Sequence, residues 1–179
     1  MDFNTIIKFW FKDIDSKKWF EKDDNFDQLL KERFNSLVDL ALDDNLMDWN
    51  VNIKGNLALI LLLDQFTRNI YRNTPKAFAG DEKALKFCFI GITKGYLEYD
   101  NTSWRHFLLM PLMHSENLAI QELSQPLFKK YTNDKTYDFA KRHYEIINNF
   151  GRFPHRNAIL GRKSTQEEVI FLKKPGSSF

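Results

Sequence analysis

The sequence predicts an all-α protein of about seven helices joined by short loops. No alternation of apolar and polar residues, the pattern of a half-buried strand, persists along the chain, whereas apolar residues recur at intervals of three or four. Glycine and proline are scarce, with 7 and 5 residues, and most stand where a predicted helix ends. Because the 179 residues contain no linker-like segment, we expect a single domain over 1–179.

The first long helix is expected over residues 26–41, where apolar residues lie on one face and Asp23 or Asp24 can cap the N-terminus. The next helix covers residues 56–72 and contains an uninterrupted apolar run, Leu57 to Leu63. Seven successive apolar residues leave no face for water. We therefore expect this run to be the most buried helical segment of the protein.

The later helices are bounded by ordinary helix-end signals. They are expected over residues 81–94, ending at Gly95; 103–113, interrupted or kinked at Pro111; 116–125, capped by Ser115; 134–150, capped by Asp134 or Thr136 and ended by Gly151; 154–160, closed by Gly161; and 163–174, where Ser164 with Glu167 and Thr165 with Glu168 form overlapping capping boxes. The tail 175–179 either stays loose or docks through Phe179.

Charge and cysteine content narrow the classes of function. The net charge of +2 is far from the basic excess of a nucleic-acid-binding protein. The single cysteine, Cys88, cannot form an internal disulfide, which fits a reducing compartment. The N-terminus lacks the pattern of a secretory signal, and the run 57–63 is too short to span a bilayer. We expect a cytoplasmic protein that binds neither nucleic acid nor membrane.

Polar residues follow abruptly after the apolar run, in LLLDQFTRNIYR. Asp64, Arg68 and Arg72 are spaced to share one helical face, and Gln65 with Asn69 form a second row beside them. A solvated face with an ion pair explains this pattern. So does a buried helix that emerges to line a cleft, and the two interpretations are evenly balanced.

The second motif is MPLMHSENLAIQE, in which Ser115 and Glu116 suit a helix start. His114 follows an apolar pair and is not explained by the helix start. His114 and Glu116 could form an acid/base or metal-ligand pair, although an isolated histidine more often has a structural role.

The third motif, FGRFPHRNAILGR, concentrates Arg152, His155, Arg156 and Arg162 in thirteen residues. Pro154 can begin a short helix, which places two of these cations in its first turn. The N-terminus of a helix is partly positive, so cations there need an anion nearby. That anion is either an internal carboxylate, such as Asp64 or Glu116, or a bound ligand.

These blocks together resemble the bacterial domain of unknown function 924 family. The matching segments are FWF at 9–11, WF at 19–20, LALILLLDQFTRNIYR, AFAGDEKAL, FLLMPLMHSEN with QE following, FGRFPHRNAILGR, STQEE and FL. The resemblance covers almost the whole chain. It implies a tetratricopeptide-like fold of stacked antiparallel helix pairs without the repeat consensus, and it implies no function.

The favoured hypothesis is a site for an anionic small molecule where the three motifs meet, because arginine binds carboxylate and phosphate oxygens in pairs. The candidate ligand-binding residues are Asp64, Gln65, Arg68, Asn69, Arg72, His114, Glu116, Arg152, His155, Arg156 and Asn157. If the site is catalytic, the candidates for acid/base roles are His114, Glu116, His155 and Asp64. No nucleophile, phosphate-binding loop or cofactor is expected.

Two alternatives remain open. A concave helical surface could bind a peptide or its terminal carboxylate as an interaction module. A metal could be held by histidines of the second half, His106, His114, His143 and His155, with Asp64 or Glu116. The Glu-x-x-His spacing of di-iron bundles is absent, and no metal ligands are assigned.

Overall fold

The computed structural model describes residues 1–178 and consists of helices and loops, with no β-strand in that range. The α-helices are α1 (Phe3–Lys8), α2 (Asp24–Leu42), α3 (Ile53–Ile60), α4 (Thr67–Ile70), α5 (Asp81–Thr93), α6 (Thr102–Met113), α7 (Leu118–Tyr131), α8 (Asp134–Phe150) and α9 (Gln166–Leu172). Short 3-10 turns link them at Ser16–Trp19, Met47–Trp49, Pro75–Phe78, Tyr96–Glu98 and Pro154–Arg156. The all-α prediction is confirmed.

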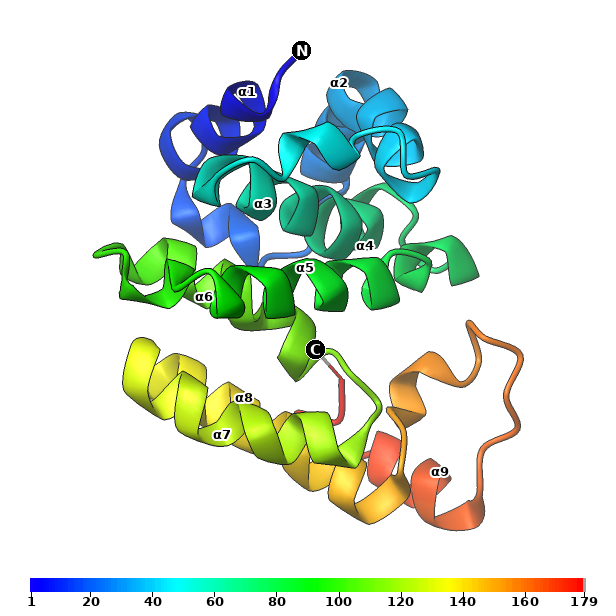
Figure 1. Ribbon diagram of the computed structural model, residues 1–179. Coiled ribbons are helices and arrows are strands. Elements are labelled where there is room, and N and C mark those ends of the chain that lie inside the picture. The colour runs from blue at the N-terminus through cyan, green and yellow to red at the C-terminus, as the bar shows by residue number, and fades with distance from the viewer. Residues whose placement is uncertain (179) are drawn as a thin grey trace.

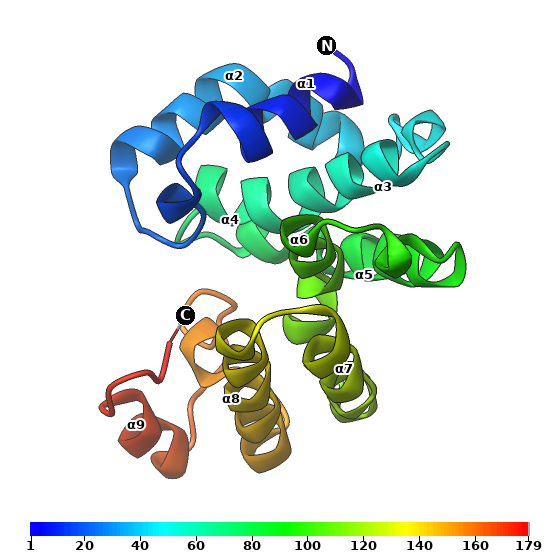
Figure 2. The ribbon, with the colours of Figure 1, turned by 90° about the vertical axis from the view of Figure 1, so that its left-hand side faces the viewer.

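The helices stack in two groups, as Figures 1 and 2 show. In the N-terminal group, α3 packs against both α1 and α5, while α2 packs against α4. Helix α6 packs against α5 and α7, and so connects this group to the C-terminal group of α7, α8 and α9. The segment between α8 and α9 returns beside the junction of the two groups (Figure 1).

The buried helix of the N-terminal group runs continuously over α3 and α4, with a π-helical turn at Leu61–Phe66 between them. Every side chain from Leu57 to Leu63 has an exposed fraction of 0%. The predicted burial of this run is confirmed. A π turn inserts an extra residue into the helical register, and such turns are frequent at functional sites. Here the π turn changes the direction in which the polar residues after the apolar run point, relative to a regular α-helix.

Several predicted helix ends are confirmed. Asp23 caps α2 by accepting hydrogen bonds from the amides of the first turn. Thr165 and Glu168 form a reciprocal capping box at the start of α9. Gly95 and Gly151 follow α5 and α8 with φ of 75° and 69°, the left-handed conformation that glycine adopts without a steric penalty.

Other predicted helix ends are wrong. Helix α7 is capped by Asn117 rather than by Ser115. The reason is that α6 continues past Pro111 and has its C-cap at His114, directly before Ser115. Helix α8 is capped by Asn133, whose side chain accepts from the amide of Thr136, and not by Asp134 or Thr136. In both cases an asparagine in extended conformation directly precedes the helix, and its short side chain reaches the first free amides.

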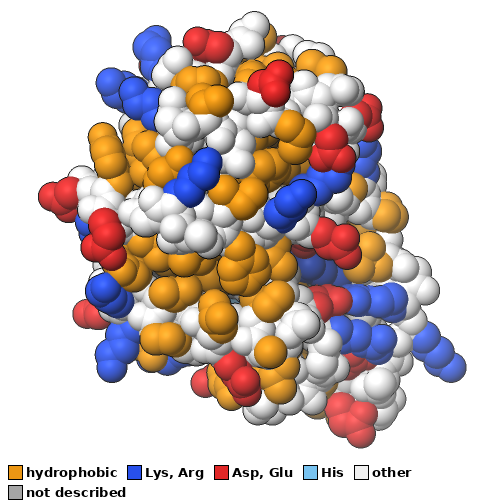
Figure 3. All heavy atoms as spheres, viewed as in Figure 1, with side chains coloured by type: hydrophobic (Ala, Val, Ile, Leu, Met, Phe, Trp, Pro, Cys, Tyr) orange, Lys and Arg blue, Asp and Glu red, His pale blue; other side chains and the backbone are white. Residues whose placement is uncertain are grey.

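The helix expected over residues 154–160 is only the 3-10 turn Pro154–Arg156, although Gly161 ends the segment with φ of 66° as predicted. No helix within residues 1–178 is long and apolar enough to cross a membrane. The expected docking of Phe179 lies outside the described residues. On the face shown in Figure 3, apolar side chains gather across the middle of the molecule, over and below α5.

Candidate functional site

A buried aspartate and a histidine form the centre of the candidate site. Asp64 lies in the π turn, has an exposed fraction of 0%, and accepts a hydrogen bond from Nδ1 of His114 at 2.6 Å. Gln65 also donates to the Asp64 carboxylate. His114 is the C-cap of α6, and the hydrogen bond of its ring to Asp64 is made through Nδ1. The carboxylate therefore fixes the ring, with the proton on Nδ1 and Nε2 left as an acceptor.

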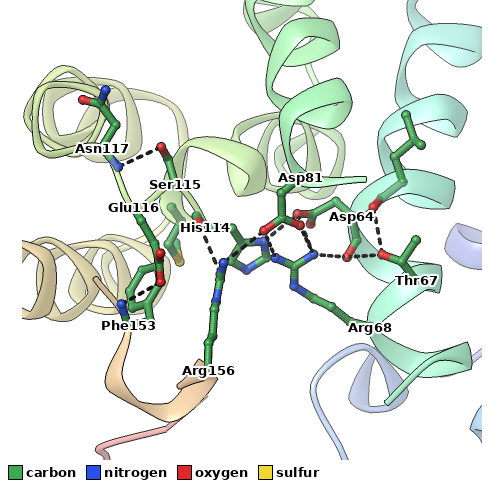
Figure 4. Close-up of polar contacts among 12 residues, drawn as sticks. Asp64, Thr67, Arg68, Asp81, His114, Ser115, Glu116, Asn117, Phe153 and Arg156 are labelled. Carbon is green, nitrogen blue, oxygen red and sulfur yellow. Dashed lines mark hydrogen bonds and ion pairs between the residues drawn. The ribbon is translucent and has the colours of Figure 1, made fainter. Parts of the chain in front are cut away.

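Asp81, the first residue of α5, joins two arginines from distant parts of the chain (Figure 4). Arg68 donates to both of its carboxylate oxygens, at 2.8 and 3.0 Å. Arg156 donates to the same carboxylate at 3.1 Å. Arg68 also lies 3.3 Å from the Asp64 carboxylate, which confirms the predicted pairing of these two residues along the helix. The first and third motifs thus meet at one carboxylate.

Gly80 allows this arrangement by permitting close contact between α5 and the π turn. A Cβ atom at position 80 would lie 2.2 Å from the backbone oxygen of Leu63. Real Cβ atoms do not approach a backbone oxygen this closely, so a side chain at position 80 would force the backbone apart. The missing side chain at Gly80 therefore brings Asp81 beside Asp64.

Arg156 is almost fully enclosed, with an exposed fraction of 6%. Its guanidinium lies 4.6 Å from the ring centres of both Phe78 and Phe153, and it donates to the backbone oxygen of His114 at 3.0 Å. Its Nε has no hydrogen-bond partner among the described residues. A buried donor without a partner is unusual in a native protein and calls for an explanation.

The charges of these groups perturb one another. Burial opposes ionisation of Asp64, but His114 and Arg68 outweigh it and hold the pKa of this carboxyl below its usual range. Burial, reinforced by Arg68, lowers the pKa of His114, which therefore stays neutral at pH 7. Burial and the nearby Arg68 also lower the pKa of Arg156 to about 10. The charge on Arg156 is thus only partly compensated by Asp81.

The second motif contacts the third through Glu116. Its carboxylate accepts from the backbone amide of Phe153 at 2.8 Å and from Arg162 at 2.6 and 3.0 Å. Burial works against its ionisation, but Arg162 and this amide keep the pKa of Glu116 below its usual range. Glu116 therefore anchors the returning segment. His155 lies farther along the same segment, and burial lowers its pKa to about 4.

Four of the predicted site residues lie in other networks. Asn69 and Arg72 both donate to Asp27 of α2, because the π turn and the end of α4 at Ile70 turn them away from the row of Asp64 and Arg68. Arg152 and Asn157 donate to Glu168 of α9.

Ser164 accepts a hydrogen bond from Asn157, so its predicted capping box with Glu167 does not form. These interactions join α4 to α2, and the segment after α8 to α9.

Sequence reasoning missed Asp81 and left Arg162 out of the candidate list. An acidic residue in the first turn of a helix is explained by the helix dipole alone, so Asp81 gave no reason for suspicion. The useful signal was Gly80, directly before Asp81. A glycine that no turn requires indicates a close approach of another part of the chain. Arg162 was noted within the third motif, but nothing in the sequence connected it to Glu116.

Within residues 1–178, no group of three or more histidine, cysteine, aspartate or glutamate side chains is arranged to hold a metal ion. What the cluster presents is a neutral histidine oriented by a carboxylate, next to two guanidiniums. Such a set can bind an anion and exchange one proton with it.

The fold and this cluster define an all-helical protein with a charged site between its two helical groups. The chain belongs to a family described as "Bacterial protein of unknown function (DUF924)", whose model matches residues 6–176. It is similar to a solved structure, a protein of unknown function, ATU0120, from Agrobacterium tumefaciens, with 36% identity, 96% of each chain covered and a TM-score of 0.90. None of the curated proteins compared with the chain matches it.

Proposed function

We propose that this protein binds an anionic small molecule between Arg156 and His114, with His114 as the group that exchanges a proton with it. The observation that carries this proposal is the buried guanidinium of Arg156, whose Nε is unpaired among residues 1–178. A single carboxylate or phosphate oxygen is the natural partner for such a donor. The neighbouring His114 supplies proton chemistry near neutral pH.

The charge balance of the cluster predicts how binding depends on pH. Arg68 and Arg156 carry two positive charges, and Asp64 and Asp81 carry two negative charges, so these four side chains have no net charge while His114 is neutral. A bound anion adds a negative charge, which favours protonation of His114. Binding should therefore be coupled to proton uptake and should strengthen as the pH falls from 8 to 6.

An internal role for the arginines is the competing explanation, since Asp81 already pairs with both of them. The distribution of bonds favours a ligand role for only one. Arg68 uses its guanidinium on Asp64 and on both oxygens of Asp81. Arg156 makes one bond to Asp81, and its Nε has no partner within residues 1–178, so of these two arginines it is the one with an unused donor for a ligand.

A thermal-shift screen tests the proposal. The panel contains acetate, citrate, sulfate and phosphate, together with a tripeptide whose C-terminus is either free or amidated. A ligand at about ten times its dissociation constant stabilises by about 1.4 kcal/mol, which raises the Tm of a chain of this size by about 3–6 °C. A response to the free but not the amidated tripeptide would identify a peptide carboxylate as the ligand.

Arg156→Met is the test variant in this screen, and Arg142→Met is its control because Arg142 is exposed on α8. We expect the control to respond like the parent protein and Arg156→Met to lose the response. His114→Gln should still bind but lose the pH dependence. Equal responses of the parent and Arg156→Met to every anion would contradict the proposal.

A further inference from the structure

The outward face of helix α5 carries apolar side chains that remain partly exposed. Leu85, Phe89 and Ile90 are each half-buried on this face. They line a shallow depression together with polar residues of the same helix, Glu82, Lys86, Thr93 and Lys94. In Figure 3, apolar side chains gather over this helix and in the hollow below it, toward α7. An apolar surface with a charged border is typical of a protein–protein contact.

The order of residues along α5 makes this face complementary to itself. Glu82 stands in the first turn and Lys94 is the C-cap, with the apolar residues between them. Glu82 forms no ion pair within residues 1–178, and Lys94 reaches only the backbone oxygen of Asn50, at 3.4 Å. Both charged ends are therefore available to a partner.

We propose that this face binds the same face of a second copy of the chain, with the two α5 helices antiparallel about a two-fold axis. A two-fold interface brings identical patches together in opposite directions. Glu82 of each copy then lies opposite Lys94 of the other, twice per dimer, and the apolar residues meet at the centre. A parallel arrangement would instead place Glu82 beside Glu82.

A membrane surface fits this face less well than a second copy does. The charged residues of the face are one acid and two lysines at separate positions, Glu82, Lys86 and Lys94, without the basic cluster that binds anionic lipid. The antiparallel pairing gives the acid Glu82 an opposite charge in Lys94, which a membrane surface would not. The face is small, so we expect a weak dimer that forms at about 1–100 µM.

Sedimentation velocity across this concentration range tests the proposal by charge reversal. Glu82→Lys and Lys94→Glu should each raise the dissociation constant of the dimer about tenfold, since each affects two exposed ion pairs per dimer. The double variant Glu82→Lys/Lys94→Glu restores opposite charges across the axis and should return the constant to that of the parent. Glu145→Lys, at an exposed position of α8, is the control and should have no effect.

Phe89→Glu should abolish the dimer, and its thermal unfolding shows whether it remains folded. If Phe89→Glu is unfolded, the charge-reversal variants alone decide, because their side chains lie at the border of the face. A parent protein that stays monomeric up to about 1 mM would overturn the proposal. So would a dimer that the single charge reversals leave unchanged, or a double variant no stronger than the single ones.

Discussion

Arg68 and Arg156 share Asp81, but replacing them should have different effects on stability. Arg68→Met removes the two-oxygen partner of Asp81 and the cation next to Asp64, whose exposed fraction is 0%. Leaving a buried carboxylate without its cation costs about 3–5 kcal/mol. We expect Arg68→Met to lower the free energy of unfolding by about that amount.

Arg156→Met should change stability much less. Asp81 keeps both bonds from Arg68. The losses are the bonds of Arg156 to Asp81 and to the backbone of His114, about 1 kcal/mol each, and the contacts of the charge with two aromatic rings, about 1–2 kcal/mol. Against these losses, burial lowers the pKa of Arg156 to about 10, so its buried charge costs on the order of 3 kcal/mol, which methionine does not incur. The net change should lie within about 1 kcal/mol.

Urea unfolding of the two variants at pH 7, with Arg142→Met as the exposed control, measures this difference. The account predicts a large loss for Arg68→Met, and small changes for Arg156→Met and the control. If Arg156→Met loses as much stability as Arg68→Met, then Arg156 is a structural clamp. That result would refute a ligand-binding role for Arg156.

Four further expectations follow from the packing and the titrating groups. Leu61→Ala, in the fully buried run, should lower the free energy of unfolding by about 2–5 kcal/mol in urea unfolding. Gly80→Ala should destabilise by more than about 2 kcal/mol in the same assay, since its Cβ would overlap the backbone of Leu63. Asn117→Ala should lower the Tm through loss of the cap of α7, worth about 1 kcal/mol. Burial lowers the pKa of His143 to about 3, so as the pH falls below about 6.5 the unfolded chain takes up this proton first. His143 then contributes a loss of stability of about 1.4 kcal/mol per pH unit toward pH 3, and His143→Gln should reduce the slope measured by urea unfolding between pH 7 and 5 by that amount.

Most of the helices could be predicted from the sequence because their signals are local, although α1 was missed and the helix expected over 154–160 is only a 3-10 turn. Burial of Leu57 to Leu63 follows from its composition alone, and the left-handed Gly95 and Gly151 end helices where a glycine was expected. The caps were harder to predict because several polar residues stand near each helix start. Asn117 and Asn133 are the N-caps because they occupy the extended position directly before the first helical residue.

The candidate site was predicted only in part because its centre depends on contacts between distant segments. Asp64, Arg68 and His114 were identified from polar residues that follow apolar ones. The π turn that separates Arg72 from them cannot be inferred from residue spacing, which assumes a regular helix. Asp81 was hidden because the helix dipole already explains an acid at that position.

The most direct test of the anion site is an NMR measurement of the Nε–Hε signal of Arg156, identified by its loss in Arg156→Met. The protein is titrated with the anion that gives the largest thermal shift, or with phosphate if none does, at pH 6 and pH 8. The account predicts a saturable change in this signal, with tighter binding at pH 6. A signal that stays fixed while those of exposed arginines move would contradict an anion site at Arg156.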